Sequence, residues 1–243
     1  MVRATLEKRP EDVARMFDAV AARYDAMNGL MTFGQERRWR RVVARAVAAA
    51  PGQRILDLAA GTGASSTPFA AAGAFTVACD FSIGMLAEGQ RRHQDLTFVA
   101  GDALRLPFAA DSFDATTVSF GLRNVADVDA ALRELGRVTR PGGRLVVLET
   151  ATPPAGLLRR MNGVYTRRVM PRLARVFSSD PSSYAYLAES AQAWLTQQQL
   201  AAALRAAGWQ QVVWQDLLFG AVAVHSAVRP EPRPGVPETA AAP

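Results

Sequence analysis

The 243-residue sequence has one cysteine, two histidines and no long apolar run, and each scarcity excludes a class of protein. Cys79 alone cannot form an internal disulfide, so we expect a reducing compartment, and its apolar neighbours place it in the core. His93 and His225 have no partners at metal-ligand spacing, so we expect no metal. No Ser-His-Asp or Cys-His arrangement and no internal repeat is apparent.

No segment of the chain is expected to cross a bilayer, because no window reaches the roughly 18 apolar residues that a spanning helix needs. Residues 1–17 carry charges but lack the apolar region of a secretory signal. We therefore expect a cytoplasmic protein that rests, at most, on the inner face of the plasma membrane.

Acidic residues are fewer than basic ones, 22 against 28, which gives a net charge of +6. This charge suits an anionic partner, although an arginine-rich composition explains it equally well. Nucleic acid is not expected, because no usual binding motif is present. Residues 155–179 hold six arginines and no acid, and Pro171 divides any helix there. This segment is either an amphipathic surface for anionic lipid or a cap with a solvated basic face.

Short β-like runs alternate with helical segments along residues 53–149, the pattern of βαβ units in a parallel sheet. Of the helical segments, 127–140 is followed by "PGG", which is expected to end the helix and turn into a strand. Only Leu218 and Phe219 separate the last two runs, which demands an antiparallel hairpin. An α/β fold with seven strands follows, from the runs 53–59, 75–80, 96–102, 113–120, 143–149, 211–217 and 220–228.

The expected organisation is one domain over residues 1–228. Within it we expect a helical lid at about 10–50 and a cap insertion at about 152–195. Residues 229–243 hold five of the fourteen prolines and are expected to be disordered.

A glycine-rich loop, "LDLAAGTGASS", follows the first predicted strand. Gly61 and Gly63 allow a tight turn and a close approach of the backbone to a ligand. Asp57 either braces this loop or is an ordinary polar residue at a strand end. Asp80 ends the second strand, 19 residues after Gly61, where a carboxylate accepts both hydroxyls of an adenosyl ribose. The alternative is an ordinary turn with a solvated aspartate.

Ser66 stands where the dinucleotide-binding pattern has its third glycine. A pyrophosphate cofactor needs the close helix approach that this glycine permits, whereas S-adenosylmethionine has no phosphate, so the loop favours a methyl donor. After the third strand, Asp102 is placed to accept from the adenine amino group, to cap the next segment, or to do both. The Ala103 amide is placed to donate to an adenine ring nitrogen.

Several further motifs resemble, in order, those of the ubiquinone/menaquinone biosynthesis C-methyltransferases. They are "FDAVAARYDAMNGLMTFG", "LDLAAGTG", "DALRLPF", "SFGLRNV", "VTRPGGRLVVLE", "YAYLAES" and "GAVAVH", and they span about residues 10–228. The resemblance implies a class I methyltransferase fold, S-adenosylmethionine as methyl donor, and methylation of a ring carbon of a prenylated quinol, as from demethylmenaquinol to menaquinol. It also implies donor contacts at Thr62, Asp80, Asp102, Ala103 and Ser119. To these we add, as further candidate donor-binding residues, Asp57, Gly61 and Gly63 of the glycine-loop motif and Phe81, which follows Asp80.

A quinol ring carbon is a poor nucleophile until the neighbouring hydroxyl loses its proton, and a phenol titrates near pKa ~10. Arg123 and Asn124 end the fourth strand, where a fixed charge and an oriented amide would face the donor methyl. We expect Arg123 to stabilise the quinolate and, through a water, to help remove its proton, with Tyr24 completing the network. The alternatives are a loop-bracing arginine, a helix N-cap at Asn124 and a core aromatic at Tyr24. Glu149 either assists or is structural.

Two other functions stay open from the sequence. The first is a methyltransferase for a soluble phenol or natural product. The second is a non-catalytic S-adenosylmethionine-binding module, suggested by Ala64, where many family members have an aspartate. The oligomeric state also stays open, with a homodimer among the alternatives.

Overall fold

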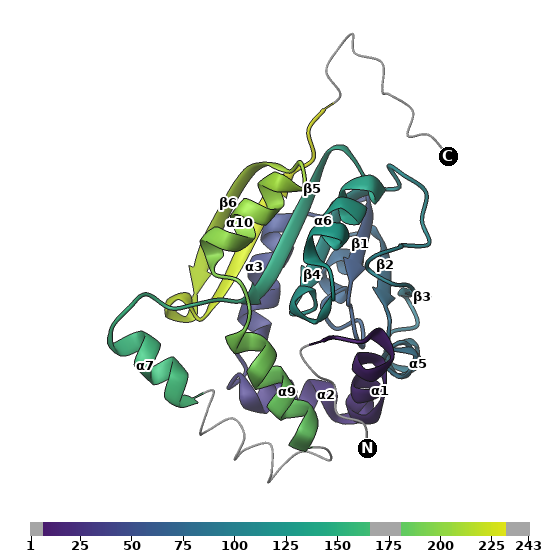
Figure 1. The fold of residues 1–243 in the computed structure, drawn as a ribbon. Helices are drawn as coiled ribbons and strands as arrows, with labels where there is room; N and C mark the ends of the chain where they lie inside the picture. Colours follow the sequence, from purple (N-terminus) through teal and green to yellow (C-terminus); the bar gives the residue numbers. More distant parts are fainter. Residues whose placement is uncertain (1–6, 166–180, 232–243) are drawn as a thin grey trace.

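A computed structural model describes residues 7–165 and 181–231, which form a seven-stranded sheet with helices on both faces (Figure 1). The strand order is β3-β2-β1-β4-β5-β7-β6. The strands are β1 (Arg54–Leu58), β2 (Phe75–Asp80), β3 (Thr97–Ala100), β4 (Phe113–Ser119), β5 (Thr139–Thr150), β6 (Gln210–Leu217) and β7 (Val222–Val228).

The described helices fall between these strands and before the first one. The α-helices are α1 (Pro10–Val20), α2 (Tyr24–Met31), α3 (Glu36–Val47), α4 (Thr67–Ala71), α5 (Ile83–Arg92), α6 (Val128–Val138), α7 (Leu157–Val164), α9 (Pro181–Gln192) and α10 (Gln197–Ala206). Short 3-10 turns are η1 (Ala21–Arg23), η2 (Leu122–Asn124) and η4 (Leu218–Gly220). Among the described helices, none is both long and apolar enough to cross a membrane.

The pairing of the strands confirms the predicted sheet. The first five strands are mutually parallel, and β7 lies antiparallel between β5 and β6. The last two strands form the expected hairpin, joined through η4. Because βαβ crossovers place helices on both faces, the central strands are buried along most of their length; four of the five residues of β1 are buried.

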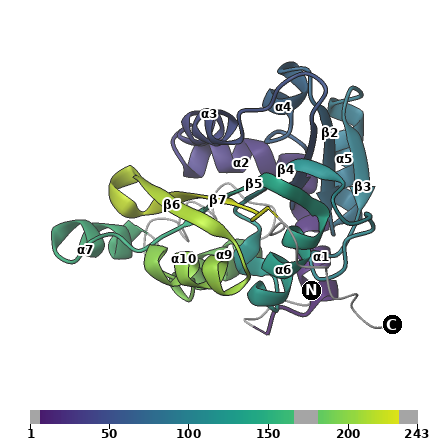
Figure 2. The same ribbon diagram turned by 90° about the horizontal axis from the view of Figure 1, so that it is seen from above.

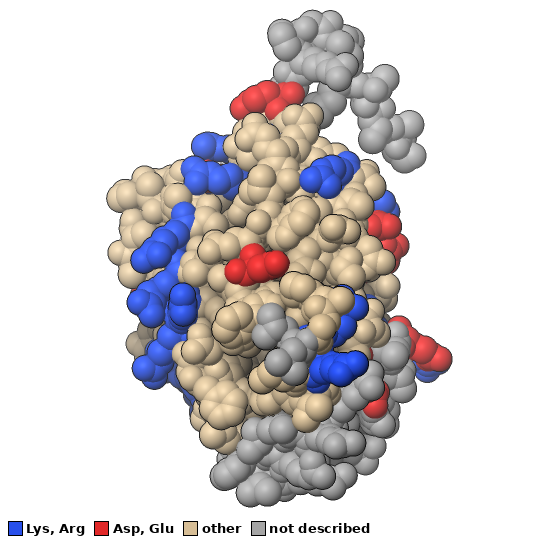
Figure 3. All heavy atoms as spheres, turned by 90° about the vertical axis from the view of Figure 1, so that its left-hand side faces the viewer, with Lys and Arg blue, Asp and Glu red and all other residues tan. Residues whose placement is uncertain are grey.

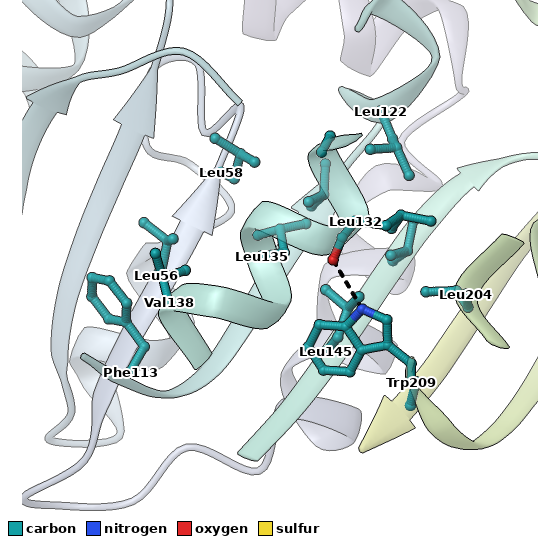
Figure 4. Close-up of a cluster of buried hydrophobic side chains, with 14 of the residues drawn as sticks. Leu56, Leu58, Phe113, Leu122, Leu132, Leu135, Val138, Leu145, Leu204 and Trp209 are labelled. Carbon is teal, nitrogen blue, oxygen red and sulfur yellow. Dashed lines mark hydrogen bonds between the residues drawn. The ribbon is translucent and has the colours of Figure 1, made fainter. Parts of the chain in front are cut away.

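Two apolar layers hold the helices to the sheet. Figure 2 shows α3 and α4 on one side and α6 and α10 on the other. On the α6 side, Leu132 and Leu135 pack between β1, β5 and Trp209, whose indole N–H donates to the Leu132 carbonyl at 3.0 Å (Figure 4). On the other side, Trp39 and Val43 pack against β5 and β7. The sheet is thus covered on both faces, and its carboxyl edge is left for other elements.

The N-terminal helices occupy that edge, at the lower end of the sheet in Figure 1. Asp18 of α1 accepts hydrogen bonds from the Ser82 hydroxyl at 2.5 Å and the Gly84 amide at 2.8 Å, at the start of α5. Asp25 of α2 accepts from the Thr62 hydroxyl at 2.8 Å. These contacts hold the predicted lid against the glycine loop.

Two expectations need adjustment, and two others cannot be compared with the structure. The helix α6 ends at Val138, so "PGG" does not end it but lies inside β5, beside an irregularity in the pairing with β4. The predicted disordered tail begins too early, because the Arg229 amide donates to the Gly143 carbonyl at 2.9 Å and continues the sheet. Pro171 and residues 232–243 lie outside the described residues.

Candidate active site

A cavity of about 1060 Å³ lies at the carboxyl ends of the parallel strands, against α1 and α2. This edge is where ligands bind in open α/β sheets. Of the twelve predicted site residues, Asp57 and Gly63 do not line the cavity. The other ten do: Tyr24, Gly61, Thr62, Asp80, Phe81, Asp102, Ala103, Ser119, Arg123 and Asn124.

The two glycines of the loop have different roles. Both have positive φ, 57° at Gly61 and 79° at Gly63, which favours glycine. A Cβ at Gly61 would be 4.0 Å from its nearest neighbour, Met85, so the backbone there is open to a ligand. A Cβ at Gly63 would lie 2.7 Å from the ring of Phe98 in β3, so this glycine serves packing.

Asp57 braces the loop, which decides between its two interpretations. Its side chain is fully buried, and one carboxylate oxygen accepts from the hydroxyls of Ser65 and Ser66, both at 2.7 Å. Burial raises the pKa of Asp57 to about 6, and the two serine hydroxyls oppose this rise. The serine in place of the third glycine therefore has a structural use, as a donor to Asp57.

Two aspartates of the predicted donor site also organise the backbone around them. Asp80 accepts from the Gly61 amide at 2.7 Å and from the Ser82 amide at 2.9 Å. Burial raises the pKa of Asp80, and these backbone donors oppose that rise. Asp102 accepts from the Leu104 amide at 2.9 Å, so it does cap the next turn. Each carboxylate oxygen has two acceptor positions, so capacity remains for a ligand.

Gly121, at the start of "GLRN", joins the end of β4 to the glycine loop. Its φ of −105° suits any residue, so conformation does not explain the glycine. A Cβ at this position would lie 2.2 Å from the Ala59 side chain, directly after β1. The missing side chain lets η2 pack against the loop, which brings the predicted donor and acceptor residues into one cavity.

The fixed charge that the sequence predicted at Arg123 is compensated by a carboxylate. Its Nη1 atom donates to Glu149 at 2.7 Å and to the Phe120 carbonyl at 2.6 Å, and both charged side chains are buried. The strand register explains the pair: β4 and β5 are parallel with Ser119 opposite Leu148, so Glu149 reaches η2. Glu149 thus holds Arg123 in place.

Two polar atoms in the cavity wall have no partner. Arg123 Nε and Asn124 Oδ1 are buried and make no hydrogen bond within the described chain. Buried polar groups in folded proteins are nearly always paired, so these two atoms at the cavity are candidate contacts for a polar ligand. The N-cap alternative for Asn124 is wrong, because Asp127 caps α6 by accepting from the Ala130 amide at 2.9 Å.

Tyr24 is both a packing residue and a cavity residue. Its ring contacts Phe17 edge to face, with centroids 5.9 Å apart, as the core interpretation predicted. The side chain also lines the cavity. Burial raises the pKa of Tyr24, so its hydroxyl stays protonated and remains a hydrogen-bond donor near neutral pH.

Sequence reasoning missed the residues that fasten the lid. Asp18 and Asp25 meet residues 64 and 37 positions away, and no local pattern indicates such contacts. Both aspartates do lie within the motif "FDAVAARYDAMNGLMTFG", which carried part of the family resemblance. That motif was the available signal for a functional role of these helices.

Comparison with known sequences gives matches that agree on one family. The ubiE/COQ5 methyltransferase family matches residues 4–229. A demethylmenaquinone methyltransferase of Streptomyces avermitilis is 56% identical over 225 residues, which cover 93% of this chain and 97% of that protein. Another, from Mycobacterium sp. strain KMS, is 54% identical over 95% of this chain and 99% of that protein.

Solved structures share the fold at low identity. The [4+2]-cyclase SpnF is 19% identical with a TM-score of 0.67, covering 96% of this chain and 98% of that one. A phosphoethanolamine N-methyltransferase of Haemonchus contortus, solved with S-adenosyl-L-methionine, is 15% identical with a TM-score of 0.61, covering 80% of this chain and 53% of that one. A cyclase among these neighbours shows that the fold alone does not fix the reaction.

Proposed function

The chain belongs to the ubiE/COQ5 methyltransferase family, and on this premise we propose that it transfers a methyl group from S-adenosylmethionine to a ring carbon of a prenylated naphthoquinol, converting demethylmenaquinol to menaquinol. The names of its curated relatives, more than half identical over nearly the whole chain, support this reaction. The structural observation that carries the proposal is the pair of unpartnered atoms, Arg123 Nε and Asn124 Oδ1, in the same cavity as the glycine loop.

The donor half of the cavity fits S-adenosylmethionine. The open side of Gly61 gives a surface for close backbone contact, and the remaining acceptor capacity of Asp80 suits ribose hydroxyls. Asp102 and the Ala103 amide would hold the adenine edge, and Thr62, Phe81 and Ser119 complete the walls. When bound, the donor supplies a sulfonium methyl group that needs placement rather than further activation.

The part of the cavity that would hold the methyl acceptor presents oriented hydrogen-bonding groups rather than a net charge. Because Glu149 compensates Arg123, the arginine offers its Nε–H as a fixed donor to the oxygen that becomes negative. Asn124 Oδ1 accepts from the hydroxyl that stays protonated. The Tyr24 hydroxyl is a further donor from the lid. Together these groups orient the ring with one carbon toward the donor methyl.

The remainder of the cavity suits the prenyl chain. Its walls include Met31, Trp39 and Leu187, and its mouth is formed by apolar side chains that solvent reaches. Phe33 and Phe219 both line the cavity and are 73% and 74% exposed. Aromatic side chains exposed at a cavity mouth suit contact with a lipid surface.

We propose that the protein receives its substrate at an anionic membrane surface. A prenylated quinol stays in the bilayer, so the cavity mouth must approach it. The helix α3 begins beside this mouth and exposes four arginines, and Figure 3 shows basic side chains in a column on the side that α3 covers. The four exposed arginines of α3 are Arg37, Arg38, Arg41 and Arg45. Each exposed basic residue adds about 1 kcal/mol of attraction to anionic lipid.

A comparison of acceptors tests the proposed function. Purified protein is incubated with methyl-labelled S-adenosylmethionine and, in separate reactions, with demethylmenaquinol in detergent micelles or with soluble phenols. Label in menaquinol is the expected result. Label only in soluble phenols, or tight donor binding with no transfer to any acceptor, would contradict the proposal.

A further inference from the structure

Lys8 is the only lysine in the chain, and it lies in the cavity. Its Nζ atom donates to the carbonyl of Val125 at 3.1 Å, 117 residues away in the sequence. Val125 directly follows η2, so the amino group reaches the segment that carries Arg123 and Asn124. An amine is thus positioned at the acceptor end of the cavity by a segment that precedes the first helix.

No carboxylate is paired with Lys8 in the part of the chain that the structure describes. Within the described residues, Lys8 forms no ion pair, and the charges that act on it are those of Glu149 on β5 and Arg123 on η2. These two groups bond to each other at 2.7 Å, so their fields largely cancel. Burial is the largest cause that lowers the pKa of Lys8; Glu149 raises it and Arg123 lowers it. Lys8 therefore loses its proton more readily than a solvated lysine, so a larger fraction of it is the neutral amine that can accept a proton.

The other ionisable groups of the cavity are less suited to take a phenolic proton. Arginine stays protonated at any physiological pH, and burial raises the pKa of both tyrosines that line the cavity in the described chain, Tyr24 and Tyr165. The four carboxylates that line the cavity each accept a hydrogen bond within the chain, and a carboxylate is a far weaker base than an amine. They are Asp25, Glu36, Asp80 and Asp102.

We propose that Lys8 is the general base of the reaction. This inference rests on the proposed function, and it assigns to Lys8 the proton removal for which the buried arginine is unsuited. The neutral Nζ takes the proton from the quinol hydroxyl, so that the O–H bond breaks and an N–H bond forms. The ring carbon next to the resulting oxyanion then forms a bond to the donor methyl, the methyl–sulfur bond breaks, and its electron pair stays on the neutral thioether.

The products balance. The methylated ring carbon loses its hydrogen as a proton, and that proton returns to the oxygen through water, which restores the aromatic quinol. The Lys8 ammonium releases its proton to solvent, so each turnover yields one methylated quinol, one thioether and one proton. No oxidant or reductant is needed. General bases of this kind contribute about 10²–10⁴-fold to turnover.

The single lysine makes a direct test possible. With lysine labelled by nitrogen-15 at Nζ, the chain gives one side-chain signal, and a pH titration of this signal reports the pKa of Lys8 alone. We expect a midpoint clearly below the ordinary ~10.4 of solvated lysine. A midpoint at the ordinary value overturns the inference, whatever the activity.

Turnover of two variants separates a base from a cation. Lys8→Arg keeps the positive charge but cannot deprotonate, and Lys8→Met removes both properties. We expect both to lower kcat by about 10²–10⁴-fold, to lose the rise in rate with pH that wild type shows through the Lys8 pKa, and to bind donor as before. A Lys8→Arg variant with more than half of wild-type turnover would show that a fixed cation suffices and would overturn the assignment.

A matched control checks the N-terminal segment. Arg9 is exposed, pairs only with Glu7 in the described chain at 3.4 Å, and does not line the cavity. Arg9→Gln is expected to keep wild-type kcat; an equal loss in this variant would mean that the segment, not the amine, matters, and would overturn the inference. If wild-type protein does not methylate demethylmenaquinol, the proposed function fails, and the Nζ titration still decides on Lys8.

Discussion

Arg123 Nη1 and Glu149 Oε1 lie 2.7 Å apart, with only 8% and 1% of the two side chains exposed. The guanidinium therefore faces into the protein at the cavity wall, with its charge compensated. Glu149 also accepts from the Thr150 amide at 2.8 Å, which fixes the carboxylate on the strand. This arrangement makes the arginine a rigid donor whose Nε–H remains for the acceptor.

Breaking this pair from one side should destabilise the fold, whereas removing both charges should not. Arg123→Met or Glu149→Leu leaves one buried charge without a partner, at a cost of about 3–5 kcal/mol. The double variant replaces the pair with apolar groups and should recover most of that free energy of unfolding. Urea unfolding of all four proteins measures this directly.

The same variants separate stability from chemistry. We expect the double variant to bind S-adenosylmethionine normally and to have turnover lowered by about 10²-fold or more, since the oriented donor is gone. Near wild-type turnover in a stable double variant would show that Arg123 has only a structural role.

Gly121 offers a test of how the two halves of the cavity are joined. Gly121→Ala places a Cβ 2.2 Å from the Ala59 side chain, so either η2 or the glycine loop must move. We expect weaker donor binding and lower turnover, measured by calorimetry and by methyl transfer. Adding Ala59→Gly removes the clash and suits the φ of +54° at that position, so the double variant should recover. If donor binding and turnover do not recover in the double variant, the clash with Ala59 is not the cause of their loss.

Asp57 should make stability depend on pH. Its pKa is raised from 3.8 to about 6 in the folded state because the carboxyl is buried. The folded state therefore holds the proton more tightly, and this contribution is present below the unfolded pKa and lost as the pH rises through 6. Its size is on the order of 3 kcal/mol.

The variant Asp57→Asn isolates this effect. Asparagine can still accept from Ser65 and Ser66, but it does not titrate. Urea unfolding between about pH 4 and about pH 7 should show a decline of wild type relative to the variant, most of it below about pH 6. If the free energies of unfolding of the two proteins change with pH in parallel, the pKa of Asp57 is not raised by burial.

The basic face of α3 should govern binding to anionic vesicles. Arg41→Gln with Arg45→Gln removes two exposed charges, at about 1 kcal/mol each, so binding should weaken roughly 30-fold. The matched control is Arg105→Gln with Arg133→Gln, which removes two exposed arginines away from α3. Both proteins should methylate a short-chain quinol in detergent equally well. Equal vesicle binding by the two variants would show that α3 is not the contact surface.

Most of the fold was accessible from the sequence because its signals are local. Strand β2 matches its prediction at both ends, and the hairpin follows from a connection too short for a crossover. The end of α6 was misplaced because "PGG" usually stops a helix, whereas here Gly143 packs where a Cβ would meet Thr139 at 2.6 Å. The glycine is therefore required by the packing of β5 and does not end the helix.

The site was accessible only in part, because its decisive contacts join distant segments. The loop and its two aspartates follow from strand ends, which a parallel sheet brings to one edge. The compensation of Arg123 depends on the register of β4 against β5, which sequence patterns do not give. Lys8 contacts Val125, which lies 117 residues further along the chain, and nothing in the sequence around Lys8 indicates that contact.

The bond formed in the product tests the central claim most directly. Protein, donor labelled with carbon-13 at the methyl group and demethylmenaquinol are allowed to react, and the extracted quinone is examined by carbon-13 NMR. We predict one enriched signal in the range of a methyl group bound to a ring carbon. Enrichment in the range of a methoxy group, or no enrichment in the quinone while the donor is bound, would contradict carbon methylation by this cavity.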